Sequence, residues 1–241
     1  MTRGPYCSTL DWLDENVSKC IFEIVDNCNE MGIGVNQFHS ECAKGQFELA
    51  IAYNDPVQIC DDVQVAKEVI INVAAKYGFN VSFMPKFDAN QIANSQHCHM
   101  SIWKHGVNLF KETLIDYDLN ERKYKDVKFN KNCEGFTGEI LNNIFAIIRL
   151  TSGSHNSLKR FVPGCFSGSY TCWGIGNKEA PLRVISGLPS DGCTTIEFKA
   201  FDAFNSIYIG LAALLAVGLD GIIKGTKLDM GKWIQGFPKD E

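Results

Sequence analysis

The most apolar stretch of the chain, IYIGLAALLAVGL at residues 207–219, most constrains what it can fold into. It is too short to span a bilayer, and the polar Asp220 and the helix-ending Gly221 follow it directly. It therefore predicts a buried helix, covering residues 205–223, that other elements have to cover. Apolar residues at helical spacing predict three further helices, over residues 11–31, 61–77 and 135–150.

Strand patterns alternate irregularly with these helices. Residues 35–41 and 46–53 read as two strands joined by a tight turn at Gly45. Further short strands are expected around His97 and at residues 80–84, 169–173, 182–185 and 194–201, whereas residues 104–132 are expected to form an irregular polar excursion. Tight turns favour antiparallel pairing. We therefore predict an α+β fold, with helices on one face of an antiparallel-rich sheet, as a single domain over residues 1–241.

Composition excludes several classes of function. The chain has 241 residues, a net charge of −5 and no dense basic run, which argues against nucleic acid or an anionic membrane as its main partner. Its ten cysteines are scattered without a C-x-x-C pair, which argues against a zinc ribbon or a redox dithiol. No apolar signal-peptide region is visible at the N-terminus. Reduced thiols and a cytoplasmic location are the resulting expectations.

Two histidines mark the stretch FMPKFDANQIANSQHCHMSIW at residues 83–103. His97 and His99 are two residues apart, and Ser101 follows at the same spacing. On a strand, residues two apart point to the same face, so these three side chains should project together. The spacing alone leaves open whether that face binds a ligand or simply meets water.

Three glutamates lie among apolar strand neighbours: Glu41, Glu48 and Glu197. A buried carboxylate is costly unless it is paired or binds a cation. Together with His97 they form a set with mostly oxygen ligands and one imidazole, which suits Mg²⁺ or Mn²⁺ better than zinc or copper. The alternative is that each glutamate forms a structural ion pair with a lysine or arginine.

The basic residues of the second half fall in short strands and the loops beside them: Lys159, Arg160, Lys178, Arg183 and Lys199. Lys199 follows Glu197 by two, so both should face the same way. Acids on one part of a sheet and bases on another would suit a metal-bound polyphosphate. A solvated face of mixed charge is the alternative.

A series of short motifs occurs along the chain in a fixed order. They are ECAKGQFE (41–48), FMPK (83–86), HCHMS (97–101), NSLKR (156–160), PG (163–164), NKEAPLR (177–183), IEFKAFDAFN (196–205) and GLAALLAVGLDGI (210–222). This order resembles the glutamine synthetase catalytic domain over roughly residues 6–223. The resemblance implies that family's curved sheet with flanking helices.

The resemblance also implies a chemistry. Family members use ATP to phosphorylate the γ-carboxylate of glutamate, and ammonia or an amine then displaces the phosphate. Two or three Mg²⁺ or Mn²⁺ ions bridge the reactants, and the enzymes are homo-oligomers. The small-molecule partners implied for this chain are therefore glutamate, ATP, and ammonia or an amine.

Roles follow from the resemblance position by position. Glu41 and Glu48 match the ligands of one metal, and His97 and Glu197 those of the metal nearer the ATP phosphates. The remaining matches concern ATP and glutamate: His99, Ser101 and Arg183 on the ATP side, and Ala93, Arg160, Lys178 and Lys199 on the glutamate side. Of these, Arg160, expected to pair with the substrate carboxylate, and Glu41 are the candidate catalytic residues.

Several positions depart from the family pattern. The loop that usually reads N-G-S-G is here residues 92–95, where Ala93 and Ser95 restrict backbone conformations that glycine allows. Asn36 stands where the family pattern has an acidic residue. Residues 165–167 lack the glutamate that the family pattern has just after the PG motif. Lysines replace arginines at Lys178 and Lys199, which turns a bidentate fork into a single-point contact.

The two ends depart as well. The chain begins after the family's E-x-E metal strand and its N-terminal β-grasp domain, and it ends before the usual C-terminal helices. The ring interface of the family is therefore expected to be incomplete. This leaves a second hypothesis beside the ligase, namely a catalytically inactive glutamine-synthetase-like fragment with a metal-binding, nucleotide-binding or structural role.

Overall fold

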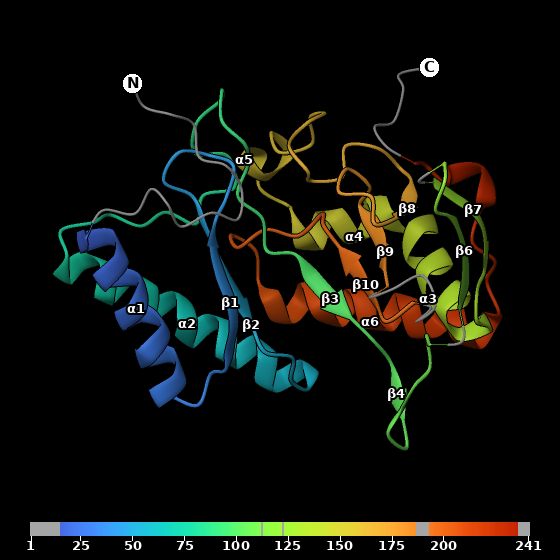
Figure 1. The fold of residues 1–241 in the computed structure, drawn as a ribbon, viewed down its shortest axis with the longest axis horizontal. Helices are drawn as coiled ribbons and strands as arrows, with labels where there is room; N and C mark the ends of the chain where they lie inside the picture. Colours follow the sequence, from blue (N-terminus) through green and yellow to red (C-terminus); the bar gives the residue numbers. More distant parts are fainter. Residues whose placement is uncertain (1–14, 112, 122, 187–192, 236–241) are drawn as a thin grey trace. The chain divides into compact units, whose positions relative to one another are not determined.

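The computed structural model describes residues 15–111, 113–121, 123–186 and 193–235 (Figure 1). Its internal contacts divide the chain into two compact units. We call Met1–Phe83 with Phe87–Ile92 the hairpin unit, and Met84–Lys86 with Ala93–Glu241 the sheet unit. Each is described by itself, and a single domain over the whole chain remains a prediction.

The hairpin unit contains two helices and one strand pair. Helix α1 (Glu15–Glu30) and helix α2 (Pro56–Lys76) bury apolar side chains in a shared core, including Cys20, Ile24, Val69 and Val73. Strands β1 (Val35–Ser40) and β2 (Phe47–Ile51) form an antiparallel hairpin, as predicted. Burial of the apolar faces of both helices against each other holds this unit together.

Helix α2 begins at Pro56, whereas the prediction placed its start at residue 61. The reason is local. The side chain of Asp55 accepts hydrogen bonds from the backbone N–H groups of Val57 and Gln58, and Pro56 occupies the first helical position. An Asp cap followed by proline is a strong helix start, and it outweighs the acidic pair further along.

The sheet unit is built on a four-stranded sheet with the order β3-β10-β9-β8. Its strands are β3 (Cys98–Met100), β8 (Trp173–Ile175), β9 (Leu182–Ile185) and β10 (Thr195–Phe198). Strands β3, β10 and β9 pair antiparallel, and β8 joins β9 in parallel. The register of the central strand sets Glu197 opposite His99 on one side and Arg183 on the other.

Helices pack beside this sheet (Figure 1). They are α3 (Lys131–Asn142), α4 (Ile144–Thr151), the short α5 (His155–Leu158) and α6 (Ile207–Lys224), with a 3-10 helix at Met230–Lys232. Helix α6 packs against α3 and α4. Gly135 and Gly221 let α3 and α6 approach closely, because a Cβ at either position would collide with the backbone of the other helix.

Helix α6 is less enclosed than predicted. It buries Leu211, Leu214 and Gly218, but Ile209 and Ile223 on its other side are exposed. Its length and mean hydropathy of 1.8 would also suit a membrane span, with 33% of that window buried. Its packing against two neighbouring helices is what a core helix of a globular unit shows.

The excursion predicted for residues 104–132 was wrong, since it contains two hairpins. Strands β4 (Trp103–Lys104) and β5 (Val107–Asn108) form the first, and β6 (Leu114–Asp118) and β7 (Lys123–Lys128) the second. The first turns at His105 and Gly106, both with positive φ (51° and 77°), which suits a two-residue hairpin turn.

Three further predicted elements differ from those in the structure. Residues 80–84 form no strand, and the backbone of Met84 and Pro85 instead accepts hydrogen bonds from Asn94. The helix predicted over residues 135–150 is interrupted at Asn143, whose side chain donates back to the carbonyl of Glu139. The strand predicted at 169–173 instead starts at its last residue, as β8.

Most cysteines in the described part of the chain form no disulfide, as predicted: Cys20, Cys28, Cys60, Cys98, Cys133, Cys165, Cys172 and Cys193. Cys42 is disulfide-bonded, so the expectation that all thiols are reduced was wrong at this position.

Candidate functional site

The sheet unit gathers polar side chains around Glu197 on the central strand β10. Its side chain is 3% exposed. Its Oε1 lies 3.1 Å from Nδ1 of His97 and 3.4 Å from Nζ of Lys199. Its Oε2 accepts a hydrogen bond from Nη1 of Arg183 at 3.1 Å, and Nε2 of His99 lies 3.8 Å from Oε1. The predicted shared faces of His97 with His99 and of Glu197 with Lys199 are therefore confirmed. We call these five residues the sheet cluster.

Protonation states in this cluster follow from burial and neighbouring charge. Burial, together with the charges of Lys199 and Arg160, lowers the pKa of His97 to about 4, so its imidazole is neutral at pH 7. Burial alone would raise the pKa of Glu197. The hydrogen bond from His97 and the positive charge of Lys199 instead hold that pKa well below its usual range. The cluster therefore contains a carboxylate and a neutral histidine.

The geometry around His97 fits a bound cation. A neutral His97 donates from Nδ1 to Glu197, which leaves the lone pair on Nε2. That nitrogen is buried and has no hydrogen-bond partner in the described part of the chain. A histidine that donates one ring N–H to a carboxylate and presents its other nitrogen is the usual arrangement of a metal ligand.

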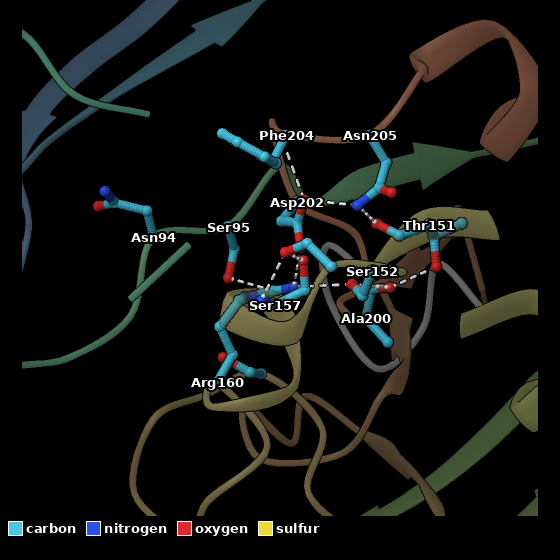
Figure 2. Close-up of polar contacts among 12 residues, drawn as sticks. Asn94, Ser95, Thr151, Ser152, Ser157, Arg160, Ala200, Asp202, Phe204 and Asn205 are labelled. Carbon is cyan, nitrogen blue, oxygen red and sulfur yellow. Dashed lines mark hydrogen bonds and ion pairs between the residues drawn. The ribbon is translucent and has the colours of Figure 1, made fainter. Parts of the chain in front are cut away.

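Arg160 lies just after α5 and is completely buried. Figure 2 shows its polar contacts. Its Nη1 donates to Oγ of Ser152 at 2.9 Å and lies 3.5 Å from Oδ2 of Asp202. Its Nη2 donates to Oγ of Ser95 at 2.6 Å and to the carbonyl of Lys199 at 3.1 Å. Burial lowers the pKa of Arg160 to about 10, so it stays charged at pH 7. Through these hydrogen bonds, the guanidinium connects the loop that contains Ser95 to Lys199, just after strand β10.

The loop that precedes the histidines is also anchored. Ala93, predicted to contact substrate, is buried at 4% exposure. Asn94 donates from its backbone N–H to the carbonyl of Pro85 at 2.8 Å and from its side chain to that of Met84 at 2.9 Å. Ser95 reaches Arg160, as Figure 2 shows. A substrate contact by Ala93 remains a prediction.

The hairpin unit holds a second polar cluster, made of His39, Glu41 and Glu48. His39 on β1 lies opposite Glu48 on β2. Its Nδ1 is 3.6 Å from Oε1 of Glu41, and its Nε2 is 3.5 Å from Oε1 of Glu48. One ligand atom from each of the three lies within 4.8 Å of the others. The structure thus brings Glu41 and Glu48 together, as predicted for a shared cation. We call this the hairpin cluster.

A family model described as the catalytic domain of glutamine synthetase matches residues 4–236 of the chain. The chain belongs to the glutamine synthetase family. Among curated relatives, it is 30% identical over 214 residues to the gamma-glutamylpolyamine synthetase GlnA3 of Streptomyces coelicolor, covering 88% of the chain and 44% of the relative. It is 33% identical over 194 residues to the glutamine synthetase of Thermotoga maritima, covering 80% of the chain and 42% of the relative. The chain thus spans less than half the length of these two relatives.

Solved structures agree with the family membership. A GmaS/ADP complex superimposes with a TM-score of 0.78 at 27% identity, covering 95% of the chain and 51% of that structure. The glutamine synthetase of Plasmodium falciparum superimposes with a TM-score of 0.75 at 27% identity, covering 90% of the chain and 40% of that structure. The predicted α+β catalytic-domain fold of this enzyme family is therefore confirmed.

Not all residues expected from the glutamine synthetase pattern join a cluster. Lys178 is exposed beside the start of β9, and Ser101 accepts a hydrogen bond from the indole N–H of Trp103 at 2.8 Å. Both terminal nitrogens of Arg160 are already engaged within the protein. The family roles of these three residues remain predictions.

Sequence reasoning missed two residues, one in the hairpin cluster and one that pairs with Arg160 beside the sheet cluster. His39 stands two residues before Glu41 on a predicted strand, so the spacing rule that linked His97 with His99 could have found it. Asp202 lies in the recognised IEFKAFDAFN motif, but its partner Arg160 is far away in sequence. No local pattern signals that pairing.

Proposed function

We propose that this chain carries the active site of an ATP-dependent carboxylate–amine ligase of the glutamine synthetase type. The proposed reaction joins glutamate with ammonia or an amine through γ-glutamyl phosphate, with release of ADP and phosphate. The sheet cluster carries the proposal. It combines a buried carboxylate, a neutral histidine with an unpaired ring nitrogen, and two cationic side chains, Arg183 and Lys199.

We assign a divalent cation, Mg²⁺ or Mn²⁺, to each cluster. In the sheet cluster, Nε2 of His97 is the proposed ligand, and Glu197 orients the ring by accepting from Nδ1 on its opposite edge. For Glu197 to ligate the same cation, as the family pattern implies, it would have to exchange this contact. In the hairpin cluster, Glu41 and Glu48 supply oxygen and His39 supplies nitrogen. A bound cation would offset the negative charge of the ATP phosphates during phosphoryl transfer.

The cationic side chains are assigned to anionic groups. Arg183 and Lys199 flank Glu197 and suit phosphate oxygens, and the exposed Lys178 can reach a carboxylate or phosphate from solvent. For Arg160 we propose that it positions the 92–95 loop against β10, since Ser95 and Lys199 are its direct partners. Pairing with the glutamate carboxylate would require Arg160 to exchange one of these contacts.

The amine substrate, the cytoplasmic location and the homo-oligomeric state are carried over as proposals from the family. The Streptomyces relative is named for polyamine, so amines larger than ammonia belong in the test. One observation favours the second candidate, a non-catalytic binding protein. The engaged and fully buried Arg160 offers no open guanidinium to a substrate.

Two measurements test the proposal. Calorimetric titration of the chain with Mn²⁺ and ATP should show saturable binding that weakens about tenfold or more in His97→Ala, since a buried ligand nitrogen is lost. His105→Ala, which removes an exposed histidine in the β4–β5 turn, is the matched control. Equal binding by wild type and His97→Ala would refute the sheet site.

Turnover is read by phosphate release from ATP with glutamate and, in turn, ammonium, methylammonium and a polyamine. Release that depends on both glutamate and one amine supports the ligase. Saturable Mn²⁺ and ATP binding without release with any amine would leave the non-catalytic binding protein as the function of this chain.

A further inference from the structure

One buried carboxylate of the sheet unit has no part in either cluster. Glu179 precedes strand β9 and is 2% exposed. Its Oε2 accepts a hydrogen bond from the backbone N–H of Gly164 at 3.3 Å. Its Oε1 is buried and has no hydrogen-bond partner, and no ion pair neutralises Glu179 within the described part of the chain. A carboxylate removed from water in this way favours binding a cation.

The loop that contacts Glu179 is strained. Gly164, Phe166 and Gly168 all have positive φ, of 82°, 54° and 85°. For a bulky residue such as Phe166 this backbone conformation is unfavourable, and such strain concentrates at ligand sites and switch regions. The loop also packs tightly on the segment of Glu179, because a Cβ on Gly168 would collide with Pro181.

Backbone contacts connect this place to the sheet cluster. The carbonyl of Pro181, two residues after Glu179, accepts a hydrogen bond from the N–H of Lys199 at 2.9 Å. At the loop's start, the N–H of Val162 donates to the carbonyl of Arg160 at 2.8 Å, and Gly164 follows two residues later. Glu179 is therefore fixed to the strand that carries the sheet cluster and to the loop that leaves Arg160.

We propose that Glu179 and the loop of residues 163–168 bind the amine substrate in its ammonium form. This inference rests on the ligase function proposed above and names the site of its nitrogen donor. The chemistry favours an ammonium group over a metal ion. One free carboxylate oxygen can accept a hydrogen bond from an ammonium N–H. Mg²⁺ and Mn²⁺ need several oxygen ligands, and Gly164 cannot supply one because it contacts Glu179 through its N–H group.

The test titrates the full chain with methylammonium chloride and follows the thermal unfolding midpoint, with sodium chloride at equal ionic strength as the reference. Wild type should be stabilised saturably, because a ligand bound only to the folded state raises its stability. Glu179→Gln keeps the shape but removes the charge, and should weaken this binding by about tenfold or more. Glu121→Gln, at an exposed pair with Lys123, is the matched control and should respond like wild type.

An equal response by Glu179→Gln and wild type would overturn the inference, as would a wild type that responds only as it does to sodium chloride. If Glu179→Gln does not fold, the δ-carboxyl ¹³C resonance of Glu179 in wild type takes its place. It should move during the methylammonium titration, and a resonance that stays in place overturns the inference.

Binding of Mn²⁺ and ATP, measured on the same samples, separates the two proposals. Intact Mn²⁺ and ATP binding in a wild type that ignores methylammonium overturns the amine site alone. Methylammonium binding by a wild type that binds neither Mn²⁺ nor ATP would keep the Glu179 cation site and overturn the ligase function on which its amine assignment rests.

Discussion

The hairpin cluster and the sheet cluster use the same local device with different surroundings. In each, an antiparallel strand pair sets a histidine opposite a glutamate: His39 opposite Glu48, and His99 opposite Glu197. The surroundings differ in burial. The side chain of Glu48 is 46% exposed, whereas that of Glu197 is 3% exposed. The same histidine–glutamate pairing is therefore exposed to solvent in the hairpin unit and largely shielded from it in the sheet unit.

The two clusters also differ in the charges that surround their glutamates, and therefore in the ligands that they favour. In the hairpin cluster, two carboxylates face one imidazole, so the excess charge is negative and favours a cation. In the sheet cluster, one carboxylate faces both Arg183 and Lys199, so the excess charge is positive and also favours anionic groups such as phosphate. Breaking a buried ion pair is strongly destabilising, whereas an exposed ion pair contributes little to stability. Substitutions should therefore change stability as well as ligand binding in the sheet unit, and mainly metal affinity in the hairpin unit.

The largest effect on stability is expected from the buried pair beside the sheet cluster. Asp202→Ala leaves the Arg160 guanidinium buried without its carboxylate and also removes the acceptor for Asn205 and for the N–H of Phe204. We expect a loss of about 3–5 kcal/mol in the free energy of unfolding, because an unpaired charge remains in the core. Denaturant unfolding at pH 7 measures it.

Asp220→Ala is the control for this substitution. It breaks an exposed ion pair with Lys224 on helix α6, which should cost less than about 1 kcal/mol. Similar losses for both variants would show that the Arg160–Asp202 pair contributes no more than a surface pair, and the contrast between buried and exposed charge would fail.

A smaller effect is expected from the pH dependence of stability at His97. Its pKa is about 4 in the folded protein and about 6.5 in an unfolded chain. Between these values the unfolded chain binds a proton that the folded chain does not, so stability falls as pH decreases from about 6.5 to 4. Wild type should lose about 2–3 kcal/mol more than His97→Gln over this range. Denaturant unfolding in EDTA at pH 7, 5.5 and 4 measures the difference.

His105→Gln serves as the reference, because this exposed residue lies in the β4–β5 turn, outside both clusters. It should follow the pH profile of wild type. A profile of His97→Gln parallel to that of wild type would mean that the pKa of His97 is the same in the folded and the unfolded protein, so that burial in the sheet cluster does not keep its imidazole neutral below pH 6.5.

The two clusters also show what the sequence could predict. The period of two along a strand correctly predicted that His97 and His99 project to the same side, and that Glu197 and Lys199 do so too. The same period of two also links His39 with Glu41. The contact of Arg160 with Asp202 depends on how α5 meets the end of β10, and tertiary packing of that kind leaves no local pattern.

A different limit applies to the first hairpin within residues 104–132, because β4 and β5 have only two residues each and are too short to show a period. The second hairpin could have been predicted, since Ile115, Asp116, Tyr117 and Asp118 on β6 alternate apolar and polar residues. Order of motifs, by contrast, identified the glutamine synthetase fold, because it depends on the whole chain and not on any single element.

The smallest effect on stability is expected in the hairpin cluster, where metal affinity should change instead. Glu48→Gln removes one of two carboxylates that face His39 while keeping the side-chain shape, so Mn²⁺ binding to this cluster should weaken about tenfold or more. Because Glu48 is 46% exposed, the free energy of unfolding should change by less than about 0.5 kcal/mol. Electron paramagnetic resonance of Mn²⁺ in a His97→Ala background isolates the hairpin site, and Glu121→Gln in the same background controls for the lost surface charge. Loss of stability without loss of Mn²⁺ binding would reverse the contrast and make the hairpin cluster a structural ion pair.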